Sequence, residues 1–315
     1  MPRVPSVRGA RPLIAQGCLP TRRNPLSSSS SQVDWDSLRF RALGENLADN
    51  QRWSTWGSVD RTLARGPQPW PDWLVTSEAA IDTDLGVLKT GKEADVFLLR
   101  RAVPDDAEVA EAGWSCLLAA KRYRSTKHRL FHRDTGYTEG RQVRKSRDNR
   151  AVARKSEYGR LVESGMWAHA EFATLKQLWT AGVPVPYPVQ ISGTEILMEF
   201  IADGDAAAPR LAQTAPGPVQ LGILWGQLVE AMITLAQLGL AHGDLSPYNI
   251  LVRDADSTVP EAILIDVPQV VDLVSNPQGT EFLHRDCRNV ATWFVRRGLP
   301  ADADALFCEV IAHAW

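Results

Sequence analysis

Three oxygen-bearing side chains in the carboxy-terminal half of the chain have the types and spacing that phosphoryl transfer needs. Asp244 and Asn249 are separated by four residues in the segment HGDLSPYN, and Asp266 ends an apolar run in AILIDV. Phosphoryl transfer requires one carboxylate to orient the attacking oxygen, and an amide and a second carboxylate to hold Mg²⁺ against the phosphates. Because Mg²⁺ prefers hard oxygen ligands and keeps several waters, one Asp and one Asn beside a nucleotide suffice. The sequence therefore predicts a site for Mg²⁺ and phosphate around these residues.

The same two residue types also occur often in turns. An Asp and an Asn at this spacing, taken alone, fit a turn as well as a catalytic site. The His-Gly that precedes Asp244, and the apolar strand that leads to Asp266, favour the catalytic interpretation.

The chain upstream of Asp244 offers the remaining groups of such a site in the required order. A nucleoside triphosphate needs a glycine-containing hairpin over its phosphates, a lysine on a neighbouring strand, and a glutamate that holds this lysine. Lys121 ends the apolar run LLAAK, where a charge needs a partner or a ligand, and Glu171 could pair with it from a predicted helix. The candidate phosphate-binding residues of the hairpin TGKEADVF are Thr90, Gly91, Lys92 and Glu93.

Each of these upstream groups also has an ordinary structural interpretation. The hairpin has only one glycine, Lys121 could extend to solvent from the end of its strand, and Glu171 could lie on a solvated helix face. What favours a site is that all these groups, from the hairpin to Asp266, follow one another along the chain in the required order. The segment MEFI then fits a linker between two lobes whose backbone binds adenine, at Met198, Glu199 and Ile201.

The hydrophobic pattern predicts strands first and helices second, with one helix among the strands. Alternation indicates two strands within 85–100, a strand over 115–123, a strand pair over 191–201, and a strand over 262–267. Helical spacing starts at Met166 and stops at Gly182, and further helices are expected over 221–240, about 280–297 and 302–314. This order is α+β, with a β-rich amino-terminal lobe and a helical carboxy-terminal lobe.

The chain of 315 residues is 44% hydrophobic and 23% charged, an ordinary globular balance with a net charge of −2. The charge is unevenly distributed: residues 121–160 carry about +10 and the rest about −12, so one segment is suited to anions. The longest apolar run, over 221–241, is interrupted by Gln227, Glu230 and Gln237 and predicts a buried helix. We therefore expect a soluble protein with no membrane partner.

Four regions are expected along the chain. Residues 1–33 are rich in Arg and Ser without any acidic residue, which predicts a disordered tail and is also typical of a transit peptide. Residues 34–80 hold five tryptophans, interpreted as anchors that pack an extension on the folded body. An amino-terminal lobe over 81–200, with a basic flexible loop at 124–160, and a helical lobe over 201–315 follow. The four cysteines form no CxxC pair, which favours a reducing, cytoplasmic location.

Taken together, these segments resemble the RIO family of atypical protein kinases, in its type-1 branch. The similarity covers roughly 81–315, and the segments IDVPQ and FLHRDCRNV make it specific, because ordinary kinases lack them. The resemblance implies an ATP- and Mg²⁺-dependent serine/threonine kinase or ATPase of compact, bilobal, protein-kinase-like fold. The segments are TGKEADVF, AAKRYR, FHRDTGY, WAHAEFATLKQL, GVPVPYPV, ILMEFI, HGDLSPYNILV, LIDVPQ and EFLHRDCRNV.

The resemblance also implies a role for each site residue. Lys121 would contact the α- and β-phosphates and Glu171 would hold it, while Asp244 would be the catalytic aspartate. Asn249 and Asp266 would bind the metal, and Asp266 would also accept phosphate as an aspartyl intermediate. Relatives act in maturation of the small ribosomal subunit, so a ribosomal or RNA partner is implied for the basic loop at 124–160.

Two alternatives remain open at this point. A small-molecule phosphotransferase of the aminoglycoside or choline kinase type shares HGDxxxxN, but only 49 residues follow Asp266, which leaves little room for a small-substrate pocket. The second alternative is a non-catalytic assembly factor in which ATP binding shifts a conformational equilibrium. The protein substrate is not identified by the sequence.

Overall fold

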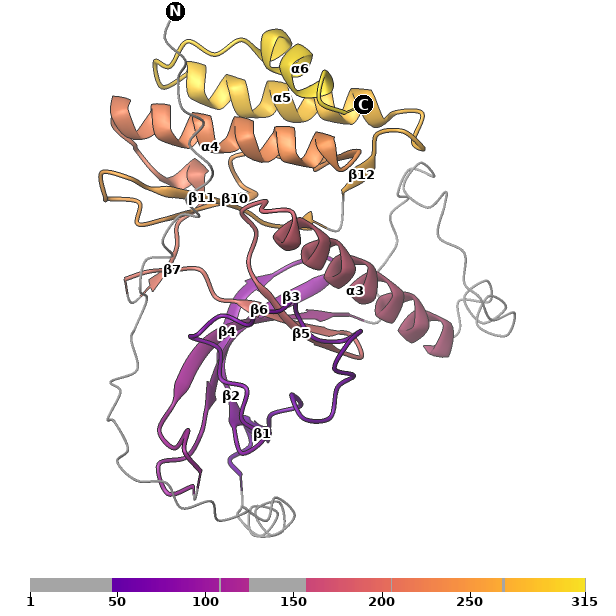
Figure 1. Ribbon diagram of the computed structural model, residues 1–315, viewed down its shortest axis with the longest axis vertical. Helices are drawn as coiled ribbons and strands as arrows, with labels where there is room; N and C mark the ends of the chain where they lie inside the picture. The colour runs from indigo at the N-terminus through magenta and orange to yellow at the C-terminus, as the bar shows by residue number, and fades with distance from the viewer. Residues whose placement is uncertain (1–46, 108, 125–156, 205, 268–269, 315) are drawn as a thin grey trace, which may run out of the picture.

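A six-stranded antiparallel sheet with the order β1-β2-β3-β4-β6-β5 forms the amino-terminal lobe. The computed structural model describes residues 47–107, 109–124, 157–204, 206–267 and 270–314, without the side chains of 157–162. Figure 1 shows the sheet below a helical lobe, with a long helix, α3, running along it. The strands are β1 Gln51–Trp53, β2 Ile81–Thr90, β3 Ala94–Ala102, β4 Ser115–Tyr123, β5 Pro188–Ser192 and β6 Glu195–Glu199.

The segment between β1 and β2 connects the two edges of this sheet. β1 pairs with β2 at one edge. At the other edge, the Gly66 N–H donates to the Val189 carbonyl and the Ile191 N–H donates to the Ala64 carbonyl, each at 2.9 Å. A Cβ at position 66 would lie 2.0 Å from the Pro188 carbonyl oxygen, so only glycine allows this approach.

The tryptophans of this segment pack on the sheet. Trp56 is buried and meets Trp70 edge to face at 5.0 Å between ring centroids, and Trp73 meets Tyr187 in the same way at 6.2 Å. Trp53 lies in β1. The fifth tryptophan, Trp35, and the tail at 1–33 lie outside the described residues.

Helix α3 spans Glu157–Thr180 and packs on β4, β5 and β6. It begins nine residues before the predicted start at Met166, a correction to the expected loop over 124–160. Its first turns contain two glycines and few apolar side chains, so the apolar stripe that signals a helix starts only at Met166. Residues 125–156 of the basic segment lie outside the described part of the chain.

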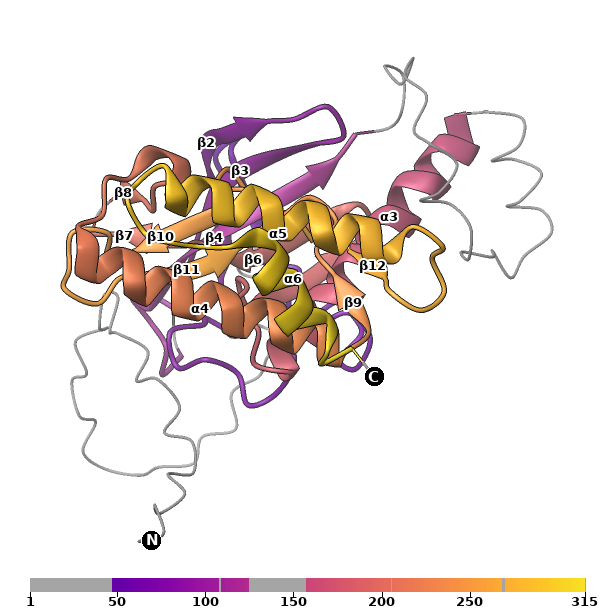
Figure 2. The same cartoon turned by 90° about the horizontal axis from the view of Figure 1, so that it is seen from above.

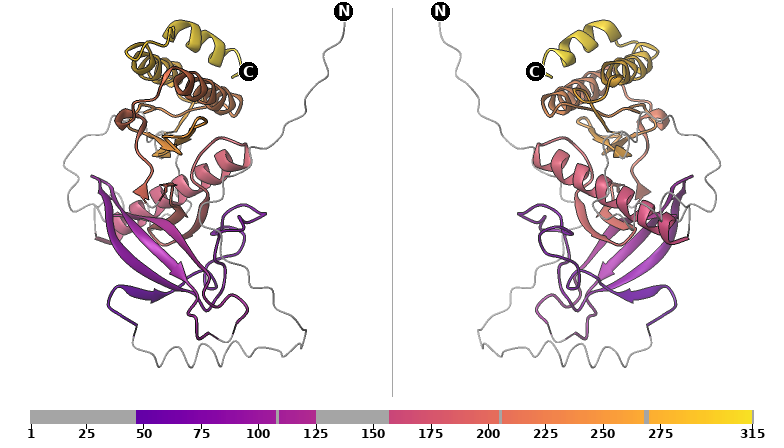
Figure 3. Two further views of the ribbon diagram at one scale, coloured as in Figure 1. Left: turned by 90° about the vertical axis from the view of Figure 1, so that its left-hand side faces the viewer. Right: turned by 90° about the vertical axis from the view of Figure 1, so that its right-hand side faces the viewer.

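The carboxy-terminal lobe is mainly helical. In Figure 2, α6 lies against both α4 and α5. Figure 3 shows these helices above the small hairpin β10–β11, which lies between them and the large sheet. The elements are β7 Ala202–Asp203, β8 Ala206–Ala207, η2 Leu211–Gln213, α4 Pro218–Gln237, β9 Leu240–Ala241, β10 Ile250–Arg253, β11 Glu261–Leu264, β12 Val271–Asp272, α5 Gly279–Val295 and α6 Ala303–Ile311.

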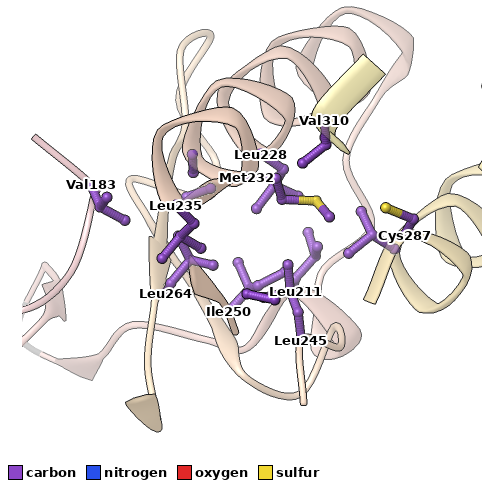
Figure 4. Close-up of a cluster of buried hydrophobic side chains, with 14 of the residues drawn as sticks. Val183, Leu211, Leu228, Met232, Leu235, Leu245, Ile250, Leu264, Cys287 and Val310 are labelled. Carbon is purple, nitrogen blue, oxygen red and sulfur yellow. The ribbon is translucent and has the colours of Figure 1, made fainter. Parts of the chain in front are cut away.

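One hydrophobic core holds this lobe together. Figure 4 shows Leu228, Met232 and Leu235 of α4 facing Ile250, Leu264 and Val310 from the other elements. By length and composition α4 could cross a membrane, but its apolar side chains pack inside this core, as the sequence predicted for a buried helix. The bilobal α+β fold expected from the order of the elements is therefore confirmed.

Candidate functional site

Lys121 joins the two lobes through its ammonium group. It lies near the end of β4, and its Nζ lies 2.6 Å from Glu171 Oε1 on α3 and 3.4 Å from Asp266 Oδ1 of the helical lobe. Only 3% of the Glu171 side chain is exposed, against 32% for Asp266. The structure thus brings together three residues that are up to 145 positions apart in the sequence.

The charges of this group stabilise one another. Burial alone would lower the pKa of Lys121, but the negative charges of Glu171 and Asp266 outweigh burial and raise it. Burial would raise the pKa of Asp266, but the ammonium groups of Lys121 and Lys89 hold it below its ordinary value. Lys121 and Asp266 are therefore both charged at neutral pH.

Tyr123 completes the environment of Glu171 and was not among the residues predicted from the sequence. Its hydroxyl donates to Glu171 Oε2. Burial and the Glu171 charge raise the pKa of Tyr123, so the hydroxyl keeps its proton and remains a donor. The signal was present, since a strand places residues two apart on the same face, and Tyr123 is two residues from Lys121.

Asp244 and Asn249 lie in the loop before β10 and contact each other. Asn249 Nδ2 donates to the main-chain oxygen of Asp244 at 2.9 Å and to its Oδ2 at 3.2 Å. The Ile265 N–H donates to the Asn249 carbonyl at 2.9 Å, which places Asn249 beside the residue that precedes Asp266. Because both donor hydrogens can stay with Asp244, the amide oxygen of Asn249 remains suited to Mg²⁺, as does the carboxylate of Asp266.

The backbone at Asp266 is unusual. β11 ends at Leu264, three residues before the end of the predicted strand, and Asp266 adopts φ +66°. Left-handed backbone is costly for most residues and is tolerated best by Gly, Asn and Asp. Buried His242 supports this turn, because its Nε2 donates to the Ile265 carbonyl at 3.0 Å. Burial lowers the pKa of His242, so the ring is neutral.

Three side chains of α5 hold the backbone around Asp244. Asp286 accepts from the Gly243 N–H at 2.7 Å and from the Leu245 N–H at 2.8 Å. Arg285 donates to the Gly243 carbonyl, and Asn289 Nδ2 donates to the Leu245 carbonyl. Burial raises the pKa of Asp286 to about 7, against the opposing effect of the two N–H donors. The segment HRDCRN contributes to the family resemblance, but no local pattern in the sequence predicts a role for it.

The candidate phosphate hairpin joins β2 to β3. Thr90 ends β2, and the Gly91 N–H donates to the Ala94 carbonyl at 3.0 Å. A Cβ on Gly91 would lie 2.7 Å from that carbonyl oxygen, which explains the single glycine. Lys92 is exposed, and the Glu93 carbonyl accepts from the Arg124 N–H at 2.8 Å.

Both the side chains and the backbone of the interlobe segment, residues 198–201, make contacts within the fold. The Glu199 side chain pairs with Arg253 of β10 and accepts from the Tyr187 N–H at 3.1 Å, so it holds the lobes together. Ile201 is buried, and its carbonyl accepts from the Ala208 N–H at 2.9 Å. Met198 is half-buried in β6. The Glu199 N–H also donates to the Tyr187 carbonyl at 2.8 Å, so the carboxylate and N–H of Glu199 and the carbonyl of Ile201 are engaged within the fold.

The described residues contain no group of three or more His, Cys, Asp or Glu side chains able to hold a metal ion. A metal held by Asn249 and Asp266 alone would need the remaining ligands from phosphate oxygens and water, which is usual for Mg²⁺. The donor set therefore fits Mg²⁺ bound together with a nucleotide.

Comparison with known proteins gives a consistent picture. A family model described as RIO domain matches residues 118–306. The RIO-type serine/threonine-protein kinase Rio1 of Haloferax volcanii is 36% identical over 87% of this chain and 81% of its own length. The serine/threonine-protein kinase RIO1 of Chaetomium thermophilum is 32% identical over 70% of this chain, which spans only 40% of that relative.

Among solved structures, a Rio2 kinase–ADP/Mg²⁺–phosphoaspartate complex from Chaetomium thermophilum is similar with a TM-score of 0.48. It is 23% identical, over 73% of this chain and 65% of that chain.

Proposed function

The chain belongs to the RIO family of serine/threonine-protein kinases, and on this premise we propose that it transfers the γ-phosphoryl group of ATP to a serine or threonine hydroxyl of a protein. The relatives from Haloferax volcanii and Chaetomium thermophilum are named Rio1 and RIO1, which fits the type-1 branch. The observation that carries the proposal is the contact of Lys121 with Glu171 on one lobe and Asp266 on the other. An ammonium held between two lobes beside a metal-binding carboxylate is the arrangement that a nucleoside triphosphate needs.

Each residue of the site then has a definite task. Lys121 has three N–H donors and uses two on Glu171 and Asp266, so one remains for a phosphate oxygen. Asp244 accepts the hydrogen bond of the attacking hydroxyl and orients it. Asn249 and Asp266 would hold Mg²⁺, which neutralises charge that develops on the phosphates. Thr90 to Glu93 cover the phosphates, and the backbone of 198–201 receives adenine.

We further propose that Asp266 itself accepts the phosphoryl group in an ATPase cycle. One of its carboxylate oxygens forms a bond to the γ-phosphorus, the bond from that phosphorus to the β–γ bridging oxygen breaks, and ADP leaves. Water then hydrolyses the acyl phosphate and releases inorganic phosphate. The lowered pKa of Asp266 supports this step, because the nucleophile must be ionised.

Labelling with [γ-³²P]ATP tests these proposals. We expect label on the protein, a fraction that hydroxylamine releases as an acyl phosphate, and a fraction that survives as phosphoserine or phosphothreonine. Asp266→Asn should remove the hydroxylamine-sensitive fraction. Absence of any label, together with absence of ATP hydrolysis, would contradict phosphoryl transfer.

The basic segment 124–160 supports a proposal about the partner. Residues 121–160 carry about +10, and such a segment suits the phosphate backbone of RNA or of a ribosomal subunit in the cytoplasm. We expect the full chain to sediment with ribosomal subunits, less so as salt rises from about 50 to 200 mM, and not at all after deletion of 125–156. Association that is indifferent to salt would exclude phosphate contacts as its basis.

A further inference from the structure

A second lysine lies on the same face of the sheet as Lys121. In the register of the strands, Lys89 of β2 faces Val96 of β3, and Val96 faces Lys121 of β4. Directly opposed residues of antiparallel strands share a face, so Lys89, Val96 and Lys121 form one row across the sheet. With two strand spacings between them, the Cα atoms of the two lysines are about 10 Å apart. Because Lys121 contacts Asp266 of the helical lobe, Lys89 lies on the face of the sheet that meets this lobe.

An arginine of the helical lobe lies near this face of the sheet, because its charge acts on Lys89. Arg210 precedes η2, and its Nη1 donates to the carbonyl of Tyr248. Tyr248 lies in the loop that contains Asp244 and directly precedes the metal-binding candidate Asn249. The backbone of Arg210 also bridges to Leu251 of β10. Its guanidinium is therefore held next to the catalytic loop.

Neither cation has an acidic partner in the described part of the chain. No carboxylate there lies within 4.0 Å of the Lys89 ammonium or of the Arg210 guanidinium, whereas Lys121, Arg122, Arg124 and Arg253 all have one. Cations that have no acidic partner are available to an anionic ligand.

The charges of Arg210, Lys121 and Asp266 all act on Lys89. Partial burial of the ammonium is the largest cause that lowers the pKa of Lys89, although much of the residue is exposed. The positive charges of Arg210 and Lys121 lower this pKa further, and the Asp266 carboxylate opposes them. Charged groups of both lobes therefore act on the pKa of Lys89.

The charge balance between the lobes indicates what these cations are for. Lys121 is offset by Glu171 and Asp266, and Asp244 adds another negative charge, so without further cations these groups would repel a triphosphate. Lys89 and Arg210 bring these six groups to neutrality. A triphosphate with its Mg²⁺ is still anionic, and such a ligand is then no longer repelled.

We propose that Lys89 and Arg210 bind the phosphate chain of ATP, as a pair of cations that closes on it from the hairpin and from the catalytic loop. This inference rests on the proposed function, because it concerns the same nucleotide. Lys121 binds the phosphates from β4, and the new pair binds them from β2 and from the residue that precedes η2. Lys89 is the second-to-last residue of β2 and therefore lies just outside the hairpin residues Thr90 to Glu93.

Nucleotide affinities of the full chain test this inference. We expect Lys89→Ala and Arg210→Ala each to weaken ATP binding about tenfold, in line with the loss of one charge-assisted hydrogen bond, and to leave adenosine binding unchanged. Lys89→Arg and Arg210→Lys should retain most of the affinity. Arg100→Ala serves as the matched control, because Arg100 is exposed on β3 away from this row. Calorimetry with ATP, ADP and adenosine gives these values.

The outcomes separate this inference from the function on which it rests. If the unmodified chain binds no ATP, the proposed function fails. If it binds ATP and Lys89→Ala binds it equally well, the inference fails alone, whatever Arg210→Ala does to the loop. Unchanged ATP affinity with a raised KM for an acidic phosphoacceptor peptide would also overturn the inference, and would assign the cations to the substrate.

Discussion

Replacing Asp244 by Asn should slow phosphoryl transfer about 10²- to 10⁴-fold and leave ATP binding intact. The amide has nearly the shape of the carboxylate but cannot take the proton of the attacking hydroxyl, which costs about 10²- to 10⁴-fold in rate. The Asn249 bond to the main-chain oxygen at position 244 does not depend on the side chain, and α5 holds the neighbouring backbone independently. The loop should therefore keep its conformation. We expect kcat to fall by this factor, and the Kd of ATP to change by less than about twofold.

A matched substitution distinguishes the loss of a catalytic group from a general effect of removing a carboxylate. Asp254 also has left-handed backbone, with φ +52°, but lies in the turn between β10 and β11. Asp254→Asn should leave kcat unchanged. If Asp244→Asn retains full biological effect although phosphorylation is lost, the protein is an ATP-gated assembly factor in which turnover is incidental.

The grouping of Lys121, Glu171 and Asp266 could be predicted because each residue is marked by its local pattern. An isolated charge at the end of a buried strand, a glutamate on an apolar helix stripe and an aspartate after an apolar run all need partners. The order of strands and helices then leaves few ways to combine them. Family membership also favours this assignment over a small-molecule phosphotransferase.

Other parts of the site could not be predicted from local patterns. Asp286 binds backbone N–H groups more than 40 residues away, and any loop could in principle receive such a bond. The position of Lys89 opposite Val96 depends on two register shifts in β2, at Asp84/Gly86 and Val87/Lys89. A one-residue slip would turn Lys89 to the other face, and alternation alone does not reveal a bulge. The edge pairing of residues 64–66 with β5 is equally hidden, because three residues carry no periodicity.

Replacing Lys121 by Met should destabilise the protein as well as abolish ATP binding. Among the described residues, the change leaves the Glu171 carboxylate, 3% exposed, with only the Tyr123 hydroxyl as a partner. Removing one member of a buried ion pair costs about 3–5 kcal/mol, because the other charge remains buried without compensation. Chemical denaturation gives the free energy of unfolding, and calorimetry gives the affinity for ATP.

The double variant Lys121→Met/Glu171→Gln separates stability from function. The glutamine amide carries no charge, and its oxygen can still accept from the Tyr123 hydroxyl, so most of the lost stability should return. ATP binding should remain lost, because no ammonium is present to meet the phosphates. Equal stability of the single and double variants would show that Glu171 is not a buried charge in need of Lys121. ATP binding by the double variant at the affinity of the unmodified chain would show that Lys121 only supports the fold.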